Sequence, residues 1–255
     1  MTDSETTLHV DNLASTCTDS GTGTEAAPFC SIQLAANVAT AGDAVLIAGT
    51  LQGGGNYSVT PGMPYAAGIT IRNPGTASAP TVFKAEGGPY EISGGDDGIT
   101  ILGDHVDISG EDVVGASLAG YWMGGTYDVL DGDQADAPGD PVYSDIGSNL
   151  TVKRSFLTTS GGEVVVLSNG GSGSVVTTNV LVAQNVGHGK NYALLAVGGS
   201  GLDITGNTIS VRGGGAAGIG VMNGASDVVV ENNVVSYIGC TGVAGDPRHA
   251  DHRVG

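Results

Sequence analysis

One nine-residue pattern recurs four times between residues 149 and 238. The copies begin at Asn149, Gly173, Gly201 and Asp227, and each has a β-branched fourth residue and an aliphatic ninth residue. A near-constant repeat of this length is typical of a solenoid, in which each repeat stacks on its neighbours. The seventh positions are 24, 28 and 26 residues apart and hold small polar residues, namely Ser155, Asn179, Asn207 and Asn233.

Each copy reads as a short strand followed by a bend. Alternating side chains, as in Leu150-Thr-Val152, turn one face of a strand inward. An Asn at the seventh position tolerates the left-handed backbone of a bend, and stacked Asn amides can hydrogen-bond between coils. We therefore predict an all-β protein, a single-stranded right-handed parallel β-helix of about seven coils. An ordinary β-sandwich with accidental regularity is the alternative.

Composition supports one elongated domain. The 255 residues include 45 Gly but only 3 Phe and 1 Trp, and Val and Ile dominate the regular stretches. Such residues suit a narrow core of stacked β-branched side chains. We expect an N-terminal cap over 1–40, the β-helix over 41–238, an acidic insertion at 115–147 that interrupts the repeat, and an irregular tail over 239–255.

The charge limits the partners. The net charge is −18 with only 8 Lys and Arg, so no basic stripe is available to neutralise the phosphates of a nucleic acid. A polyuronate would also be repelled unless a divalent cation bridged it to the protein.

The ends of the chain bear on its location. No apolar run reaches the length of a membrane span, and the start, Met1-Thr-Asp-Ser-Glu5, shows no signal peptide. Cys17 and Cys30 bracket a loop with little core of its own, which favours a disulfide and leaves Cys240 without a partner. We expect a secreted or extracellular protein in its mature form; a cytosolic protein with free thiols is the alternative.

Residues 31–39 are the one clear helix in the sequence. Ser31 can cap it, and Ile32, Ala35, Ala36 and Val38 supply an apolar stripe. A helix before the first coil would cover the open end of a solenoid.

Three phrases stand out in the N-terminal third. They are Pro28-Phe-Cys-Ser-Ile-Gln-Leu-Ala-Ala-Asn37, Ala41-Gly-Asp-Ala-Val-Leu-Ile47 and Gly75-Thr-Ala-Ser-Ala-Pro-Thr-Val-Phe-Lys-Ala85. Together they resemble the start of secreted bacterial β-helix proteins of the pectate-lyase-like superfamily, and the third is also similar to the openings of polysaccharide lyases that include alginate lyases and chondroitinase B. The resemblance implies the fold and a polysaccharide partner, but such phrases build the scaffold rather than the site.

The expected insertion is rich in aspartate. Asp128, Asp131, Asp133 and Asp136 lie close together in the sequence and are interspersed with glycine. Calcium prefers carboxylate and carbonyl oxygens on a flexible loop, so we predict these four residues as its ligands. A solvated acidic loop without metal is the alternative.

Lyase chemistry needs a base, a cation that neutralises the substrate carboxylate, and a group that protonates the leaving oxygen. The catalytic candidates are His188, Lys190 and Arg212, which we place in turns of consecutive coils, although none matches a family motif. Gly187-His-Gly189 is similar to a polygalacturonase phrase, but its partner acids would be Asp96-Asp97, several coils away and too distant for one glycosidic bond.

Two functions remain open. The first is a polysaccharide-active protein, lyase-like on an acidic glycan with calcium; the second is a non-catalytic β-helix that serves as a surface or carbohydrate-binding module. If residues 239–255 leave the last coil uncovered, self-association through that coil is expected as well.

Overall fold

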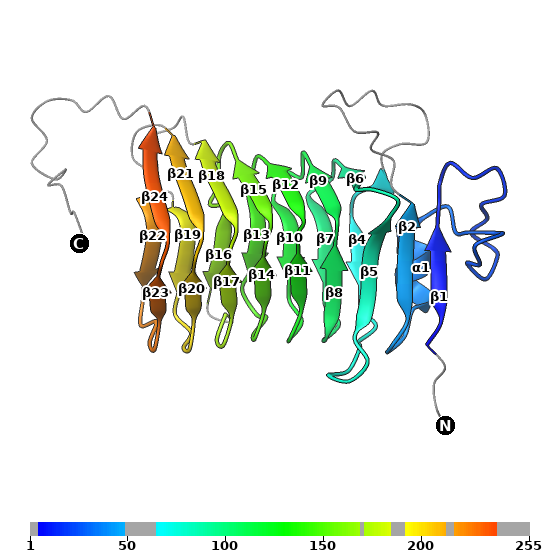
Figure 1. Cartoon of the computed structure of the whole chain (residues 1–255), viewed down its shortest axis with the longest axis horizontal. Helices are drawn as coiled ribbons and strands as arrows, with labels where there is room; N and C mark the ends of the chain where they lie inside the picture. The colour runs from blue at the N-terminus through cyan, green and yellow to red at the C-terminus, as the bar shows by residue number, and fades with distance from the viewer. Residues whose placement is uncertain (1–4, 49–64, 169–170, 185–191, 213–216, 239–255) are drawn as a thin grey trace, which may run out of the picture.

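The protein is a parallel β-helix whose coils stack along one axis (Figure 1). The structure, a computed structural model, describes residues 5–48, 65–168, 171–184, 192–212 and 217–238. Its strands form three parallel sheets, and each typical coil gives one strand to each sheet in turn, as β8, β9 and β10 do. The predicted fold class is confirmed.

The first sheet has nine strands and begins at the N-terminal end of the solenoid. All of its pairings are parallel, as between β1 and β2. In sheet order, its strands are β1 (Thr7–Val10), β2 (Ala44–Ala48), β5 (Thr81–Glu86), β8 (Val106–Ser109), β11 (Val129–Asp131), β14 (Thr151–Lys153), β17 (Val175–Thr177), β20 (Asp203–Thr205) and β23 (Val229–Glu231).

The other two sheets have eight and seven strands. The eight-stranded sheet contains β3 (Tyr65–Ala66), β6 (Tyr90–Ser93), β9 (Glu111–Val114), β12 (Gln134–Ala137), β15 (Phe156–Thr159), β18 (Val180–Gln184), β21 (Thr208–Arg212) and β24 (Val234–Ile238). The seven-stranded sheet contains β4 (Ile69–Ile71), β7 (Asp97–Ile101), β10 (Ala119–Met123), β13 (Asp140–Ser144), β16 (Val165–Ser168), β19 (Tyr192–Val197) and β22 (Ala217–Met222).

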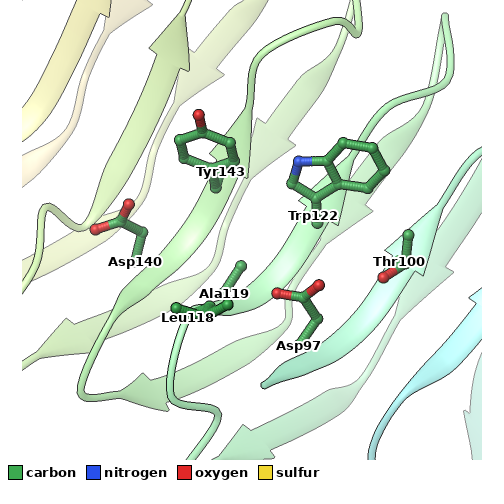
Figure 2. A pocket seen from close by; sticks show the side chains of 7 residues that line it. All are labelled: Asp97, Thr100, Leu118, Ala119, Trp122, Asp140 and Tyr143. Carbon is green, nitrogen blue, oxygen red and sulfur yellow. The ribbon is translucent and has the colours of Figure 1, made fainter. Parts of the chain in front are cut away.

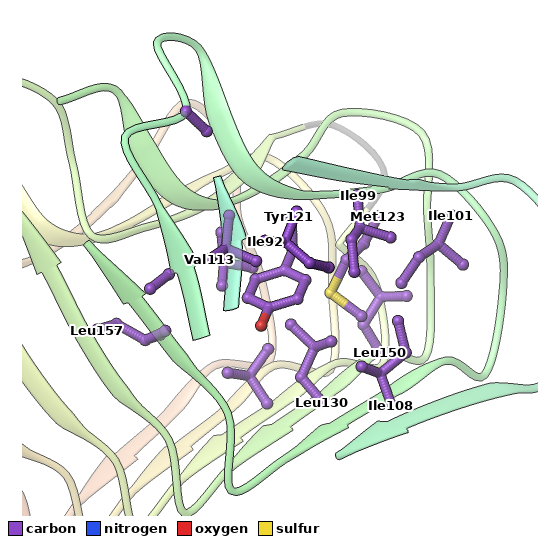
Figure 3. Close-up of a cluster of buried hydrophobic side chains, with 14 of the residues drawn as sticks. Ile92, Ile99, Ile101, Ile108, Val113, Tyr121, Met123, Leu130, Leu150 and Leu157 are labelled. Atoms are coloured by element: carbon purple, nitrogen blue, oxygen red, sulfur yellow. The ribbon is translucent and has the colours of Figure 1, made fainter. Parts of the chain in front are cut away.

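The core fills the space between the three sheets. Side chains that alternate inward stack in columns; in one of them, Val152, Val176 and Ile204 are paired neighbours and almost fully buried. Figure 3 shows Tyr121 among such residues, with Leu130 facing it from another sheet. Full burial of an aliphatic side chain contributes about 1.5–3 kcal/mol, so the columns are the main source of stability.

A ladder of polar residues fills the corner between the nine-stranded and eight-stranded sheets. In each pair, the backbone N–H of one residue donates to the side-chain oxygen of its equivalent in the next coil, as from Asn179 to Asn207 at 3.1 Å. We call the set the corner ladder: Glu111, Asp133, Ser155, Asn179, Asn207 and Asn233.

The bend itself differs by one residue from our expectation. The left-handed conformation belongs to the residue before each ladder position, as at Arg154 (φ 55), Thr178 (φ 55) and Gly206 (φ 67). The ladder side chain is therefore free to point inward and bond along the axis, while its neighbour makes the turn.

The expected insertion at 115–147 is instead a regular part of the solenoid. Asp133 occupies the corner ladder, 22 residues from Glu111 and 22 from Ser155. Strands β10 to β13 pair in register with the coils on both sides. The pattern was missed because an aspartate stands where later coils have Ser or Asn and because small Ala135 replaces a larger aliphatic residue.

The N-terminal segment closes one end of the helix. Cys17 and Cys30 form the predicted disulfide, with Cα atoms 5.1 Å apart. Helix α1 (Ile32–Val38) follows, and the Ser31 side chain accepts a hydrogen bond from the Leu34 N–H, as predicted. The Gln33 side chain bonds both backbone groups of Thr70 in β4, which ties the helix to the seven-stranded sheet. Val38, expected in the apolar stripe, is 47% exposed.

The core side chains of the last described coil are more exposed than those of the coils before it. Val230 and Val235 face inward like Ile204 and Ile209, but they are 46% and 39% exposed whereas those two isoleucines are fully buried. Within the described part of the chain, no helix has the length and apolarity to cross a membrane.

Candidate functional site

A cleft of about 460 Å³ lies on the outer face of the seven-stranded sheet (Figure 2). It spans three consecutive coils, over strands β7, β10 and β13. Its lining combines two aromatic rings, two carboxylates and small or apolar groups, from Asp97, Thr100, Leu118, Ala119, Trp122, Asp140 and Tyr143.

The aromatic side chains face outward because of strand alternation. In β10, Tyr121 and Met123 are buried in the core, so Trp122 between them points to the other face. Trp122 pairs in register with Thr100 on one side and with Tyr143 on the other. Neighbouring strands are about 4.8 Å apart, so these three residues form a row along the helix axis. We call it the aromatic row.

A second row, of carboxylates, runs parallel to the first at the start of the same strands. Ala119 pairs with Asp97 in one neighbouring coil and with Asp140 in the other, and Figure 2 shows the two aspartates on either side of it. The Asp140 Oδ1 atom accepts a hydrogen bond from the Glu163 N–H at 2.9 Å. We call Asp97, Asp140 and Glu163 the carboxylate row.

Burial shifts the protonation of this row. The pKa of Asp140 is raised to about 6, mainly by desolvation. The backbone hydrogen bond from Glu163 opposes this rise, and the negative charge of Glu163 adds to it. Desolvation also raises the pKa of Asp97 and of Glu163, and in each the backbone hydrogen bonds oppose it. Among the described residues, no Lys or Arg lines the cleft, so nothing basic offsets these carboxylates there.

The turns beside the carboxylate row are closely packed. Gly162 lies against Asp140, and a Cβ atom at this position would collide with the Asp140 Oδ1 atom. Gly139 lies as close to the backbone of Leu118 in the preceding coil. The turns that lead into the strands therefore contain glycine because neither has room for a side chain.

The structure does not gather the four aspartates predicted to bind calcium. Asp128 and Asp133 are fully buried and accept backbone hydrogen bonds from the preceding coil. Asp131 pairs with Arg154 and Lys153, and the Arg154 hydrogen bond lowers its pKa. Asp136 accepts from the Thr158 hydroxyl. They separate because strand residues alternate in direction and because β11 and β12 belong to different sheets.

The described residues hold no group of three or more His, Cys, Asp or Glu side chains placed to bind a metal ion. Calcium binding stays a prediction, without support from the four aspartates.

Of the three predicted catalytic residues, the structure describes one, Arg212, which does not line the cleft. His188 and Lys190 lie outside the described residues. Arg212 ends β21, an exposed position of the eight-stranded sheet, whereas the cleft lies on the seven-stranded sheet.

Sequence reasoning missed the cleft residues Trp122, Tyr143 and Asp140 because it assigned them to an insertion. The alternation of Tyr121-Trp-Met123 was the available signal, since a buried residue on either side turns Trp122 outward.

The architecture and the cleft together define a parallel β-helix with an outward-facing groove across its coils. No protein-family model matches the chain, and no curated protein sequence is similar to it. Solved structures share the fold. The pectate lyase Pel9A aligns over 82% of this chain and 53% of its own, with 16% identity and a TM-score of 0.55. An alginate lyase from Paenibacillus sp. str. FPU-7 aligns over 77% of this chain and 95% of its own, with 16% identity and a TM-score of 0.50.

This chain thus spans about half the length of the pectate lyase. At this level of identity the likeness concerns the fold, and the site has to be argued from its own residues.

Proposed function

We propose that this protein is polysaccharide-active and that it binds a glycan in the cleft of the seven-stranded sheet. The observation that carries the proposal is the aromatic row beside the carboxylate row, with Trp122 and Tyr143 next to Asp97 and Asp140. Aromatic side chains offer apolar faces for the apolar faces of sugar rings, and carboxylates accept hydrogen bonds from hydroxyls. A few convergent polar groups in a mainly apolar groove are typical of a binding site.

The fold neighbours add support of a coarser kind. They include proteins named pectate lyase and alginate lyase, so a polysaccharide is the partner that their names suggest for this chain. The Cys17–Cys30 disulfide supports the predicted extracellular location, because disulfides persist in oxidising compartments.

Two candidate functions fit this proposal, one catalytic and one not. A lyase acting on an acidic glycan with calcium stays a prediction, which needs a base and a cation beside the substrate carboxylate. The alternative, a non-catalytic carbohydrate-binding module, is favoured by one observation: the cleft lining contains carboxylates and aromatic rings but no basic side chain among the described residues.

Truncating the aromatic row tests the binding site. We expect Trp122→Ala to weaken glycan binding at least about tenfold, because the indole is the largest apolar group that lines the cleft. Affinity electrophoresis and calorimetry against a panel of soluble polysaccharides would measure this. Phe156→Ala is the matched control, because Phe156 is an exposed aromatic residue (45%) of the eight-stranded sheet. Equal affinities for the two variants, or no binding of any polysaccharide, would reject the cleft as the site.

The lyase candidate is tested separately by following the ultraviolet absorbance of unsaturated products. Pectate, alginate and chondroitin, each with calcium or with a chelator, are the substrates. If none of these substrates gives an unsaturated product, the lyase candidate is rejected and the non-catalytic carbohydrate-binding module remains.

A further inference from the structure

Among the residues that the structure describes, the cleft carries negative charge without a basic side chain to balance it. Asp97 and Asp140 line it, and Glu163 continues the same row in the next coil. The described basic side chains are used or placed elsewhere: Lys153 and Arg154 pair with Asp131 at the nine-stranded sheet, Lys84 is on β5 of that sheet, and Arg212 ends β21. Arg72, which follows β4, does not line the cleft. The whole chain adds a net charge of −18 to this local field.

A carboxylated glycan would meet this row unfavourably. Like charges brought together in a partly desolvated groove repel each other more strongly than in bulk water, and discrimination can rest on such repulsion. A sugar hydroxyl has no such penalty. Asp97 and Asp140 each receive a backbone hydrogen bond from the next coil, and a carboxylate has capacity for further donors.

The rest of the lining suits an uncharged ring. Leu118, Ala119 and the two aromatic rings are apolar; Figure 2 shows Ala119 and Leu118 between the two aspartates and the rings on one side of them. A strongly hydrated ammonium group would have to lose water against these apolar walls, whereas a pyranose presents an apolar face to them and hydroxyls at its edge.

We propose that the cleft selects glycans without carboxylate groups, with the chain lying along the helix axis, its rings over Trp122 and Tyr143 and its hydroxyls toward Asp97 and Asp140. The inference rests on the proposed function and names the substrate class of the same site. It has a chemical consequence. β-Elimination needs a C6 carbonyl, of a carboxylate or of its ester, to acidify the adjacent proton, so a glycan that has neither group is not a substrate for lyase chemistry in this cleft.

One matched pair of probes isolates the charge. Highly methyl-esterified polygalacturonan and the same material after de-esterification share a backbone and differ in their carboxylates. We expect the esterified form to bind at least about tenfold more tightly at low salt, and the difference to shrink in high salt, because screening weakens repulsion.

Variants then assign the effect to the cleft. The double variant Asp97→Asn with Asp140→Asn removes two charges and keeps an oxygen acceptor at each site, so we expect the de-esterified polymer to bind it several-fold better than it binds the unmodified protein. The matched control, Glu86→Gln with Glu231→Gln, removes two carboxylates from strands of the nine-stranded sheet and should leave the preference unchanged. Circular dichroism establishes that both double variants are folded.

The outcomes separate the two proposals. Binding that Trp122→Ala abolishes but that favours the de-esterified polymer, or that favours chitosan above every uncharged glycan, overturns the inference and leaves the proposed function in place. A charge preference that the control pair alters as much as the cleft pair also overturns the inference. Binding of none of the polymers overturns the proposed function itself.

Discussion

Single residues of the corner ladder decide how well two coils fit together. Asn207 is fully buried; its Oδ1 atom accepts from both the backbone and side-chain nitrogens of Asn179, and its Nδ2 atom donates to the Val176 carbonyl. The early coils have acids at this position, and the Glu111 Oε2 atom is buried without a hydrogen-bond partner. Burial, and then the charge of Asp133, raise the pKa of Glu111 well above its ordinary value. Asparagine therefore meets the hydrogen-bonding needs of this buried position better than glutamate does.

Asn207→Ala should destabilise the protein by about 2–4 kcal/mol. The change removes four hydrogen bonds and leaves the buried backbone N–H of Asn179 without an acceptor, and an unsatisfied buried group costs about 1–3 kcal/mol. Chemical denaturation monitored by circular dichroism gives the free energy of unfolding. Asn37→Ala, on the exposed part of helix α1, is the control and should change stability by less than about 0.5 kcal/mol. Similar losses in both variants would contradict the role of the ladder.

The buried carboxyl of Asp128 predicts that stability falls as the pH rises. Desolvation raises its pKa from 3.8 to about 8, so the folded state holds a proton that the unfolded state releases between these values. Its contribution is fully present below the unfolded pKa and is lost as the pH rises through the folded pKa.

Thermal unfolding between pH 5 and pH 8 measures this loss. We expect a decrease of at least about 2 °C in Tm over that range and a flatter profile in Asp128→Asn, which keeps the oxygen that accepts the Val106 N–H. The exposed Asp227→Asn is the control and should leave the slope as it is. A Tm that rises with pH in the unmodified protein but not in Asp128→Asn would contradict the sign.

At the scale of the elements, the closed N-terminal end depends on a covalent link as well as on packing. The Cys17–Cys30 bridge spans 13 residues of a loop that leads into helix α1. Loss of the bridge through Cys17→Ser with Cys30→Ser should lower stability by about 3 kcal/mol, mainly by freeing the unfolded chain. Calorimetry with and without reductant measures the effect. Cys240→Ser is the control, and a loss of the same size there would assign the effect to thiol chemistry in general.

The strands show how far sequence reasoning extends. Columns such as Val152, Val176 and Ile204 alternate cleanly, so the coils from 149 to 238 and their register could be predicted. The coil that contains β11 to β13 could not, because Asp133 in the corner ladder reads as solvated acid until its burial is known. Because this coil was not predicted, the cleft was not predicted either. Asp97 and Asp140 lie two coils apart only because the coils have a regular length and register, which an assumed insertion concealed.

At the scale of the whole molecule, the two ends of the described solenoid differ. Helix α1 and the disulfide close one of them, while strands β22, β23 and β24 form the last described rung of the other. Exposed strand edges with apolar side chains are sites of association. Self-association through the last coil therefore stays our prediction for the intact protein.

Sedimentation velocity over a range of concentrations would measure this association. We expect Val230→Lys to shift the protein toward monomer, because Val230 faces the open core at this end. Val180→Lys, at an exposed valine (38%) on the outer face of the eight-stranded sheet, should not. If the unmodified protein remains strictly monomeric at high concentration, the prediction is wrong.

The corner ladder also gives the molecule a mechanical direction. Each coil pairs only with the coils on either side of it. Tension applied between the two ends is therefore resisted by one coil-to-coil interface at a time. The β24 side should peel first, since the opposite side is fastened by α1 and the disulfide. Coils between ladder residues contain 22 to 28 residues, so each rupture would release roughly 75–100 Å of extended chain. Under load, such a protein would behave as a stepwise extensible tether that lengthens from one end.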